Sequence, residues 1–493
     1  MVSEQKNINI ISSLINKSHH PLSLSLATNH ISIAHTSLPI TISTSSNTTT
    51  LNNQTTQVST PPDLIVQNTV APNSVAAGST LNINYQIKNQ GSENAFSSYT
   101  LFYLSHDTSV SDDDLYLGSD EIASLNPGAY SSRTVTFSIE KNAAAGSYYL
   151  LYKADANNNV VETNENNNIV AKAIALQNSF SSINGYGLIN AAAALAQAIG
   201  QTTFGDVPDL GGLNWGADLI KAPEVWAKGY TGAGITVAVV DSGVDRNHRD
   251  LNSNIWKNTK EIAGNNKDDD GNGYIDDVYG WNFVSNNNNT LDKNGHGTHV
   301  AGTIAGVNNS FGVTGIAYNA KIMPVKVLSD NGSGSDSAIA NGIRYAVDNG
   351  ANVINVSIGK EQPNTDIQLA VEYASSKGAI VVMAAGNAGA STPYYPASYA
   401  QAWGLAVGAV DQYGTTADFS NRAGTELLSY VTAPGVGVYS TLPGNKYVSW
   451  NGTSMATPHV AGVVALMLSA NKNLTDAQIR KIITATASNS LTA

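Results

Sequence analysis

An Asp, a His and a Ser, each set among small residues, could together perform nucleophilic chemistry in this sequence. Asp241 lies in Val-Val-Asp-Ser-Gly (239–243), His296 in Asn-Gly-His-Gly-Thr-His (294–299) and Ser454 in Gly-Thr-Ser-Met-Ala-Thr-Pro (452–458). A serine hydroxyl becomes a nucleophile when a histidine accepts its proton and a carboxylate orients and stabilises the charged imidazole. Each motif alone is more typical of a turn or a helix cap. Together and in this order they predict a catalytic Asp-His-Ser triad.

The elements around these motifs predict where the three side chains lie. Asp241 follows an apolar run over 235–240, which predicts a buried strand with the carboxylate at its carboxyl end, where α/β sheets place their sites. His296 precedes a helix of small residues, and Ser454 begins an apolar helix whose N-terminus favours developing negative charge. Further strands are expected at 322–328, 353–357 and 380–384. The alternation of strands and helices predicts a doubly wound parallel α/β domain over 213–493.

These motifs resemble those of the subtilisin-like serine proteases (subtilases), and the resemblance covers residues 214–490. It implies hydrolysis of peptide bonds. A fourth motif, Val-Met-Ala-Ala-Gly-Asn (382–387), also matches. The resemblance implies that the side chain of Asn387 and the backbone N–H of Ser454 stabilise the oxyanion of the reaction intermediate.

The resemblance also implies where a substrate binds. Two edge segments clamp an extended peptide as an added strand, and a third forms the wall of the first specificity pocket. The corresponding residues are Ser333, Gly334 and Ser335, then Ser357, Ile358 and Gly359, then Ala384, Ala385 and Gly386. Because these segments contain no acidic residue, we expect a broad, mainly apolar preference.

An acidic segment predicts calcium binding. Residues 268–277, Asp-Asp-Asp-Gly-Asn-Gly-Tyr-Ile-Asp-Asp, place oxygen-bearing side chains at alternating positions before a glycine that permits a sharp turn. This is how an EF-hand-like calcium loop begins, although the twelfth position is Tyr279 rather than glutamate. A solvated acidic turn is the alternative. The expected Ca²⁺ ligands are Asp268, Asp270, Asn272, the carbonyl of Tyr274, and Asp277 or Asp276.

The subtilase resemblance implies a second calcium loop over 307–313. Its ligands would come from Val307, Asn309, Phe311 and Val313, together with Asp250. The family's further ligand, near the start of the domain, falls on Gly211, which has no side chain, and Asp209 is its nearest substitute. His248, His299 and His459 lack a metal-binding pattern, so we expect structural roles for them.

The part of the chain before this domain divides into three segments. Residues 1–60 are rich in Ser, Thr and Asn, which predicts a disordered leader. Residues 61–176 alternate apolar and polar residues between turn signals, as in Leu81, Ile83, Tyr85 and Ile87, which predicts an antiparallel β-sandwich. Its segments 62–64, 87–91 and 162–167 resemble CARDB, an immunoglobulin-like module of bacterial secreted proteins. Residues 177–212 are expected to be a connector with an Ala-rich helix.

Two departures from subtilases lead to hypotheses. No segment resembles the family's usual inhibitory pro-domain, so we expect the leader and sandwich to be removed or displaced by cleavage within 177–212, as in a zymogen. Subtilase domains commonly end in a Gly-x-Gly-Leu-Ile-Asn-Ala helix, whereas this chain has that motif at 185–191. Either this helix packs where the terminal helix would lie, as in a circular permutation, or it is an unrelated linker helix.

Composition narrows the remaining classes. The 493 residues include 25 Lys and Arg against 37 Asp and Glu, a net charge of −12, and no cysteine. Nucleic-acid binding is therefore not expected, and disulfides and thiolate chemistry are excluded. No apolar stretch is long enough to span a membrane. The N-terminus lacks an ordinary secretory signal, yet we favour a secreted protein over a cytoplasmic one.

Two other functions remain open beside a calcium-dependent endopeptidase acting on proteins or peptides. One is a catalytically silent adhesion protein whose sandwich binds a protein or surface ligand. The other is an esterase or peptide ligase that uses the same triad for acyl transfer.

Overall fold

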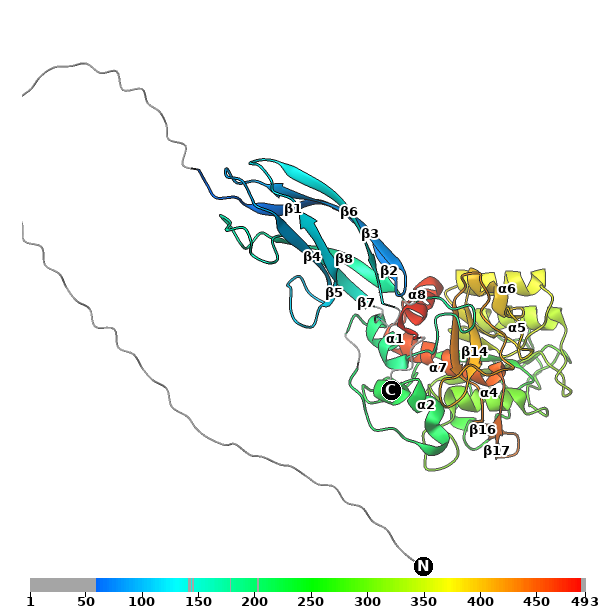
Figure 1. The fold of residues 1–493 in the computed structure, drawn as a ribbon. Coiled ribbons are helices and arrows are strands. Elements are labelled where there is room, and N and C mark those ends of the chain that lie inside the picture. The colour runs from blue at the N-terminus through cyan, green and yellow to red at the C-terminus, as the bar shows by residue number, and fades with distance from the viewer. Residues whose placement is uncertain (1–58, 141–142, 144–145, 178, 202–203, 489–493) are drawn as a thin grey trace, which may run out of the picture. The chain divides into compact units, whose positions relative to one another are not determined.

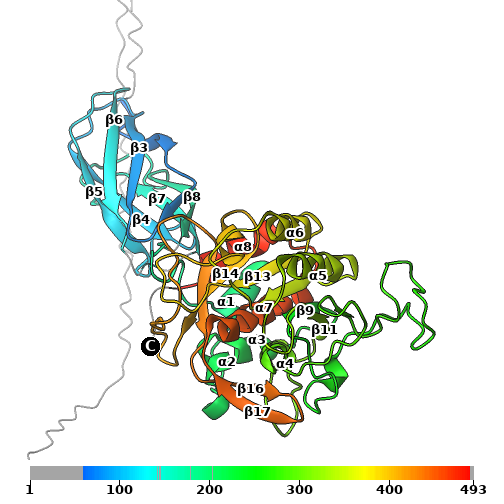
Figure 2. The ribbon, with the colours of Figure 1, turned by 90° about the vertical axis from the view of Figure 1, so that its right-hand side faces the viewer.

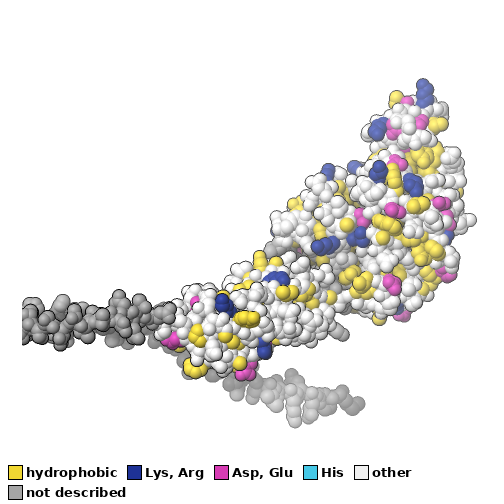
Figure 3. Space-filling view, turned by 90° about the horizontal axis from the view of Figure 1, so that it is seen from above, with side chains coloured by type: hydrophobic (Ala, Val, Ile, Leu, Met, Phe, Trp, Pro, Cys, Tyr) yellow, Lys and Arg dark blue, Asp and Glu magenta, His cyan; other side chains and the backbone are white. Residues whose placement is uncertain are grey.

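The computed structural model of the chain describes residues 59–140, 143, 146–177, 179–201 and 204–488 (Figure 1). Of the leader expected at 1–60, all but Ser59 and Thr60 lie outside the described residues. The face in Figure 3 carries scattered single charged side chains on a largely uncharged surface, as a content of 13% charged residues implies.

Residues 64–177 form a β-sandwich. One sheet has the order β1 (Leu64–Val70), β3 (Thr80–Asn89), β6 (Tyr130–Ser138), and the other the order β2 (Ser74–Ala76), β8 (Ile169–Gln177), β7 (Gly146–Lys153), β4 (Ser98–Ser105), β5 (Leu115–Ile122). Neighbouring strands are antiparallel except β2 and β8, which are parallel. The alternating apolar side chains of β3 are buried and share one core with Phe102 and Tyr152 of the other sheet. The predicted antiparallel sandwich is confirmed.

The C-terminal part is built on a seven-stranded sheet whose strands are all parallel. Their order is β10 (Trp281–Asn282), β11 (Lys321–Lys326), β9 (Thr236–Asp241), β12 (Val353–Val356), β13 (Ile380–Ala384), β14 (Leu405–Val410), β15 (Tyr430–Pro434). The strands are apolar runs because both faces of the sheet are covered. The four strands expected from the sequence are present, and the α/β fold is confirmed.

Helices cover both faces of this sheet (Figures 1 and 2). The core on one face contains α1 (Ala191–Ala198), α3 (Ala222–Trp226), α4 (His296–Ala305), α7 (Thr453–Ala470) and α8 (Asp476–Thr486). The core on the other face contains α5 (Asp336–Asp348) and α6 (Thr365–Ser376). The shorter elements are α2 (Trp215–Leu219), η1 (Gly212–Asn214), η2 (Asn252–Asn254), η3 (Ala397–Gln401) and the antiparallel hairpin of β16 (Val438–Leu442) and β17 (Lys446–Trp450).

Two of these helices follow directly from the sequence. Helix α8 begins with the expected capping box, in which Thr475 and Gln478 cap each other's backbone N–H groups. Helix α7 is, within the described residues, the one helix long and apolar enough to cross a membrane, but 83% of its residues are buried inside the protein. A helix that is mostly apolar and buried in this way belongs to the core of the α/β part.

The upstream Ala-rich segment packs into the core of the α/β part. The backbone N–H of Ile189 donates to the carbonyl of Thr432 in β15 at 3.0 Å, and Asn190 caps α1 through the N–H of Ala193. Leu195 is fully buried, and α1 packs against α3, α7 and α8. Gly185 has φ +59°, and a Cβ there would lie 2.3 Å from the carbonyl oxygen of Tyr430. Residues 185–198 are therefore an integral part of this core rather than a solvated linker.

Candidate active site

The first two triad residues meet at the carboxyl edge of the parallel sheet. Asp241 ends β9 and is fully buried, and His296 begins α4. Both carboxylate oxygens of Asp241 lie near Nδ1 of His296, at 2.8 and 2.9 Å. Burial lowers the pKa of His296, but the charge and hydrogen bond of Asp241 outweigh it, so the pKa lies above its ordinary value. This pair orients the imidazole with Nε2 available for a proton.

Ser454 lies at the start of α7, in the first turn of the helix. Its hydroxyl donates to the carbonyl of Ser357 at 3.0 Å, and no hydrogen bond joins Ser454 to His296 within the described residues. The two are nevertheless neighbours in the fold, because Trp450, shortly before Ser454, stacks on the ring of His296 with centroids 6.4 Å apart. The serine hydroxyl therefore donates to Ser357 rather than to the histidine in this structure.

Asn387 is held with its amide nitrogen outward. Its Oδ1 accepts from the backbone N–H and the hydroxyl of Thr453, at 2.8 and 2.9 Å. Because these two contacts fix Oδ1, Nδ2 points toward Gly452. A Cβ added at Gly452 would lie 3.4 Å from Nδ2. This is a fixed donor beside Ser454. Thr453 was not singled out from the sequence, although it lies within the serine motif.

Asp292 is a second residue that the sequence reasoning missed. It is buried, and its carboxylate accepts from the hydroxyls of Ser242 and Thr298 and from the backbone of Asn294, Gly295 and Thr298. It thus closes the loop that carries His296. The signal available in the sequence was its place two residues before Asn294, at the head of the histidine motif.

The expected substrate segments leave strands that lie side by side. Residues 333–335 follow β11, residues 357–359 follow β12, and residues 384–386 begin at the last residue of β13, while Asp241 ends β9 between β11 and β12. Ser333, Gly334 and Gly359 are exposed. Parallel strands present their carboxyl ends at one edge of a sheet, so all three segments border the same edge as the triad.

Tyr394 enters the predicted specificity pocket. An added Cβ at Gly359 would lie 3.7 Å from Cβ of Tyr394, and one at Gly386 would lie 3.1 Å from its ring atom Cδ2. Tyr394 therefore adjoins the expected pocket wall at Gly386 with its ring and the edge segment at Gly359 with its Cβ. Its hydroxyl donates to Glu361 at 2.9 Å. The sequence did not reveal this residue because it comes from the loop before η3, outside the matched motifs.

The acidic loop brings together a different set of carboxylates from the one expected. Asp268 and Asp270 lie with Glu261 in a cluster whose ligand oxygens are within 4.8 Å of one another. Asn272 adjoins them through its backbone N–H, which donates to Asp268 and Asp270.

The other expected ligands of this loop form hydrogen bonds around the cluster. Asp276 accepts from the backbone N–H groups of residues 264–266, and Asp277 accepts from Asn258, Asn272 and Tyr345. The Tyr274 N–H donates to Asn272, and its ring packs against Trp281. The cluster with Glu261 is a set of oxygen donors without nitrogen or sulfur, which suits Ca²⁺.

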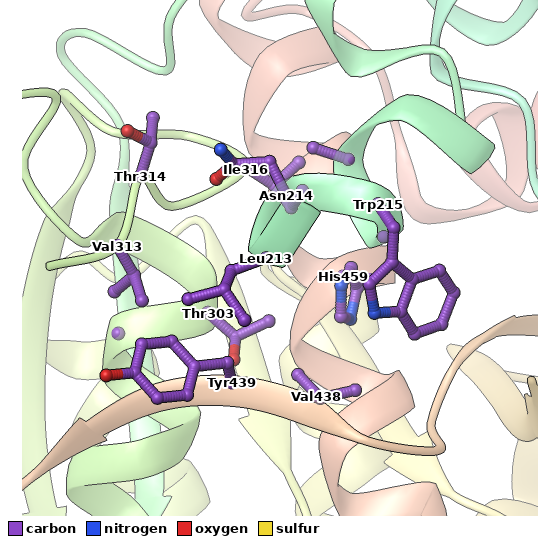
Figure 4. Close-up of a pocket in the computed structure, with 13 residues that line it drawn as sticks. Leu213, Asn214, Trp215, Thr303, Val313, Thr314, Ile316, Val438, Tyr439 and His459 are labelled. Atoms are coloured by element: carbon purple, nitrogen blue, oxygen red, sulfur yellow. The ribbon is translucent and has the colours of Figure 1, made fainter. Parts of the chain in front are cut away.

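Part of the second expected loop is also assembled. Asp250 is fully buried and accepts from the Asn309 side chain at 2.8 Å and from the Val313 N–H at 2.9 Å. Val307 donates its N–H to the Asp250 carbonyl, and Phe311 donates its N–H to Asn309. Figure 4 shows a pocket lined by Val313, Thr314 and Asn214, whereas Gly211 and Asp209 do not line it. Asn214, from the start of this domain, thus lines the same pocket as Val313.

The three remaining histidines of interest bind backbone carbonyls. His299 contacts the carbonyls of Val438 and Val448 and stacks on Trp450, with ring centroids 4.8 Å apart. His248 contacts the carbonyl of Lys446, and His459 that of Met455. Burial lowers the pKa of His299 and of His459 to about 4, so both are neutral at pH 7.

Comparison with known proteins agrees with this geometry. The subtilase family model matches residues 232–493, and the CARDB model matches residues 61–172. Subtilisin Savinase of Lederbergia lenta is 45% identical over 274 residues, which are 55% of this chain and 90% of that protein. An alkaline protease of Alkalihalobacillus alcalophilus is 46% identical over 274 residues, 55% of this chain and 64% of the relative's length.

A solved structure, that of a cold-adapted subtilisin-like serine proteinase, has a TM-score of 0.42 and 34% identity and covers 51% of this chain and 81% of its own. The chain spans just under two thirds of the length of the alkaline protease it matches. The subtilase match, in contrast, extends over more than half of the chain. The chain therefore belongs to the subtilase family of serine proteases.

Proposed function

We propose that this chain is a calcium-stabilised serine endopeptidase that cleaves peptide bonds through Asp241, His296 and Ser454. The observation that carries the proposal is the buried carboxylate of Asp241 against Nδ1 of His296 at 2.8 Å. This contact fixes the tautomer in which Nε2 can accept a proton. It lies beside the helix start that carries Ser454.

The reaction begins when the Ser454 hydroxyl exchanges its hydrogen bond to the Ser357 carbonyl for one to Nε2 of His296. Such contacts commonly tighten only when substrate binds. His296 takes the hydroxyl proton as Ser454 Oγ attacks the scissile carbonyl, and Asp241 stabilises the imidazolium. His296 then returns the proton to the leaving amine, and water hydrolyses the acyl-enzyme by the same steps.

The negative charge that develops on the carbonyl oxygen is stabilised by Nδ2 of Asn387 and the N–H of Ser454. Thr453 holds Asn387 in place before substrate arrives, so no reorganisation is needed during the reaction. Loss of a side-chain donor of this kind costs roughly 10²–10³-fold in turnover, a value measured in a subtilisin and so borrowed from this family.

Substrate would bind as an extended strand between residues 333–335 and 357–359, with its P1 side chain directed toward residues 384–386. Tyr394 occupies part of the space beside Gly359 and Gly386. We therefore propose that small P1 side chains are preferred, which narrows the broad apolar preference expected from the sequence.

Calcium would have a structural role in this protein. Glu261, Asp268 and Asp270 supply oxygen ligands at one loop, and Asp250 and Asn309 at the other. A bound Ca²⁺ would neutralise the mutual repulsion of these carboxylates and hold each loop in one conformation.

The test of the proposed function is labelling of the nucleophile with a fluorophosphonate probe. The full chain should be labelled, the Ser454→Ala chain should not, and a matched Ser449→Ala chain, altered in the nearby β17, should be labelled like the original. Absence of labelling in the folded full chain would favour the silent adhesion protein. Labelling with release of acyl-amine products, but no hydrolysis, would favour a ligase.

We also propose that the protein acts outside the cell and that the leader and the sandwich are separated from the protease during maturation, with the sandwich binding a protein or surface ligand. The sandwich supports this only through its similarity to CARDB. Cell fractionation and N-terminal sequencing of the mature protein test both statements.

A further inference from the structure

A group of acidic side chains lies outside the protease, in the loop between β7 and β8 of the sandwich. Asp155, Glu162 and Glu165 have carboxylate oxygens within 4.8 Å of one another. Asp155 is 1% exposed and Glu162 is 8% exposed, whereas Glu165 is exposed. Glu162 and Glu165 belong to the segment 162–167 that resembles CARDB, and the proposed proteolysis uses none of them.

The charges of this group have no protein counterion. Asp63, 9% exposed, lies close enough to act on Glu162 electrostatically, as do Asp155 and Glu165. Within the described residues, none of the four forms an ion pair with Lys, Arg or His. Backbone N–H groups donate to Asp155 and Glu162, but hydrogen bonds do not neutralise the charge of buried carboxylates, so either a proton or a cation must compensate it.

A buried amide beside the carboxylates indicates that a cation, rather than a proton, compensates their charge. Asn168 is 5% exposed, and its Oδ1 has no hydrogen-bond partner although it is shielded from solvent. Its Nδ2 lies 3.3 Å from Oε1 of Glu162 and 3.5 Å from Oε2 of Glu165, so the amide faces the carboxylates. Both contacts are long for hydrogen bonds. Because amide oxygen and nitrogen have nearly the same shape, a half-turn of this group directs the unpaired oxygen to the same point.

We propose that Asp155, Glu162, Glu165 and Asn168 bind a Ca²⁺ ion in the sandwich. The four residues supply only oxygen ligands, from three carboxylates and one amide, and water completes the coordination. This set suits a hard cation with flexible geometry, and it contains no imidazole or thiolate that would favour zinc.

The site would link the two ends of the sandwich chain. Oε2 of Glu162 accepts from the N–H of Leu64 in β1 at 2.5 Å, and Asp155 accepts from the N–H groups of Asn159 and Val160. A cation held by Glu162 and Asp155 therefore fixes the loop 155–168 against the first strand. Calcium would stabilise the sandwich independently of the protease.

The experiment measures the number of Ca²⁺ ions bound per chain by equilibrium dialysis after complete removal of metal. It uses the full chain with Ser454→Ala, so that self-digestion plays no part and failure of the proposed protease function does not affect the result. The informative variant is Glu165→Lys, which places an ammonium at the cluster. Since Glu165 is exposed, the substitution leaves the buried packing intact. Asp112→Lys, an equally charged change at an exposed loop of the same sandwich, is the control.

The expected result is one bound ion fewer for Glu165→Lys than for Asp112→Lys, and an affinity reduced at least about tenfold at one site for Glu165→Gln. Asp268→Asn, which alters the protease loop, should remove a different ion, so that its loss adds to that of Glu165→Lys. Equal stoichiometry and affinity in Glu165→Lys, Glu165→Gln and the control would overturn the proposal and leave protonation as the way in which the sandwich compensates its carboxylates.

Discussion

Replacing Leu195 by alanine tests whether the upstream helix α1 is part of the protease core. Leu195 is the one leucine of α1 and is fully buried among residues of α3, α7 and α8. Truncating such a side chain in a close-packed core costs about 2–5 kcal/mol, because the transfer free energy is lost and a cavity remains. For a domain of this size, about 1 kcal/mol corresponds to 2–4 °C in Tm. The expected decrease in Tm is therefore about 4–20 °C.

The assay is thermal unfolding followed by circular dichroism, in chains that also carry Ser454→Ala to prevent self-digestion. The matched control is Gln197→Ala, in the same helix but exposed, which should change stability by no more than about 0.5 kcal/mol. If Leu195→Ala and Gln197→Ala unfold within about 2 °C of each other, α1 contributes little to the core and the packing argument is wrong.

Three further predictions follow from the site. Tyr394→Ala should raise kcat/KM for peptides with a large apolar P1 residue relative to those with alanine, and an unchanged ratio in a peptide-library profile would contradict the role given to its ring. The pKa of His296 is raised and its neutral imidazole is the base, so kcat/KM should fall as the pH decreases through a midpoint above 6.5. Asp241→Asn should lower that midpoint as well as the rate. A pH–rate profile without a titration in this range would refute the role given to His296. A calcium chelator should lower the Tm of the chain. In Glu261→Gln this decrease in Tm should be smaller, because the altered loop binds calcium less tightly. An unchanged Tm after chelation would show that calcium does not stabilise the protein.

Much of the site could be predicted from the sequence because its residues lie in short local motifs. The runs ending at Asp241 and at Ala384 show by their composition that they are buried strands, and an α/β sheet places its active residues where such strands end. Thr475 and Gln478 likewise form a capping box over four residues, so the start of α8 was readable directly. In each case neighbours along the chain supply the information.

Contacts made by residues distant in sequence could not be predicted in this way. Glu261 reaches the acidic loop by accepting from the backbone N–H groups of Asp269, Asp270 and Asp276, although it lies outside the motif that predicts the loop. Tyr394 is apolar and aromatic like many core residues, and only the approach of its loop to Gly359 and Gly386 gives it a role. The hydrogen bond of Ser454 to the Ser357 carbonyl joins residues 97 positions apart, and no local motif predicts it.

The position of α1 restricts how the sandwich can be separated from the protease. Residues 188 and 189 hydrogen-bond to Ser488 and to Thr432 of β15, and α1 completes the core beside α7. Cleavage in the exposed stretch 205–213 would break the covalent link between the sandwich and the rest of the protease. Helix α1 would nevertheless stay bound to the protease by its buried face, and the sandwich would stay attached through α1. Phe180 also packs against this part of the molecule and against the ring of Tyr186. Separation that leaves the core complete must therefore occur before Phe180, because a cut after it would divide residues that pack together in the protease.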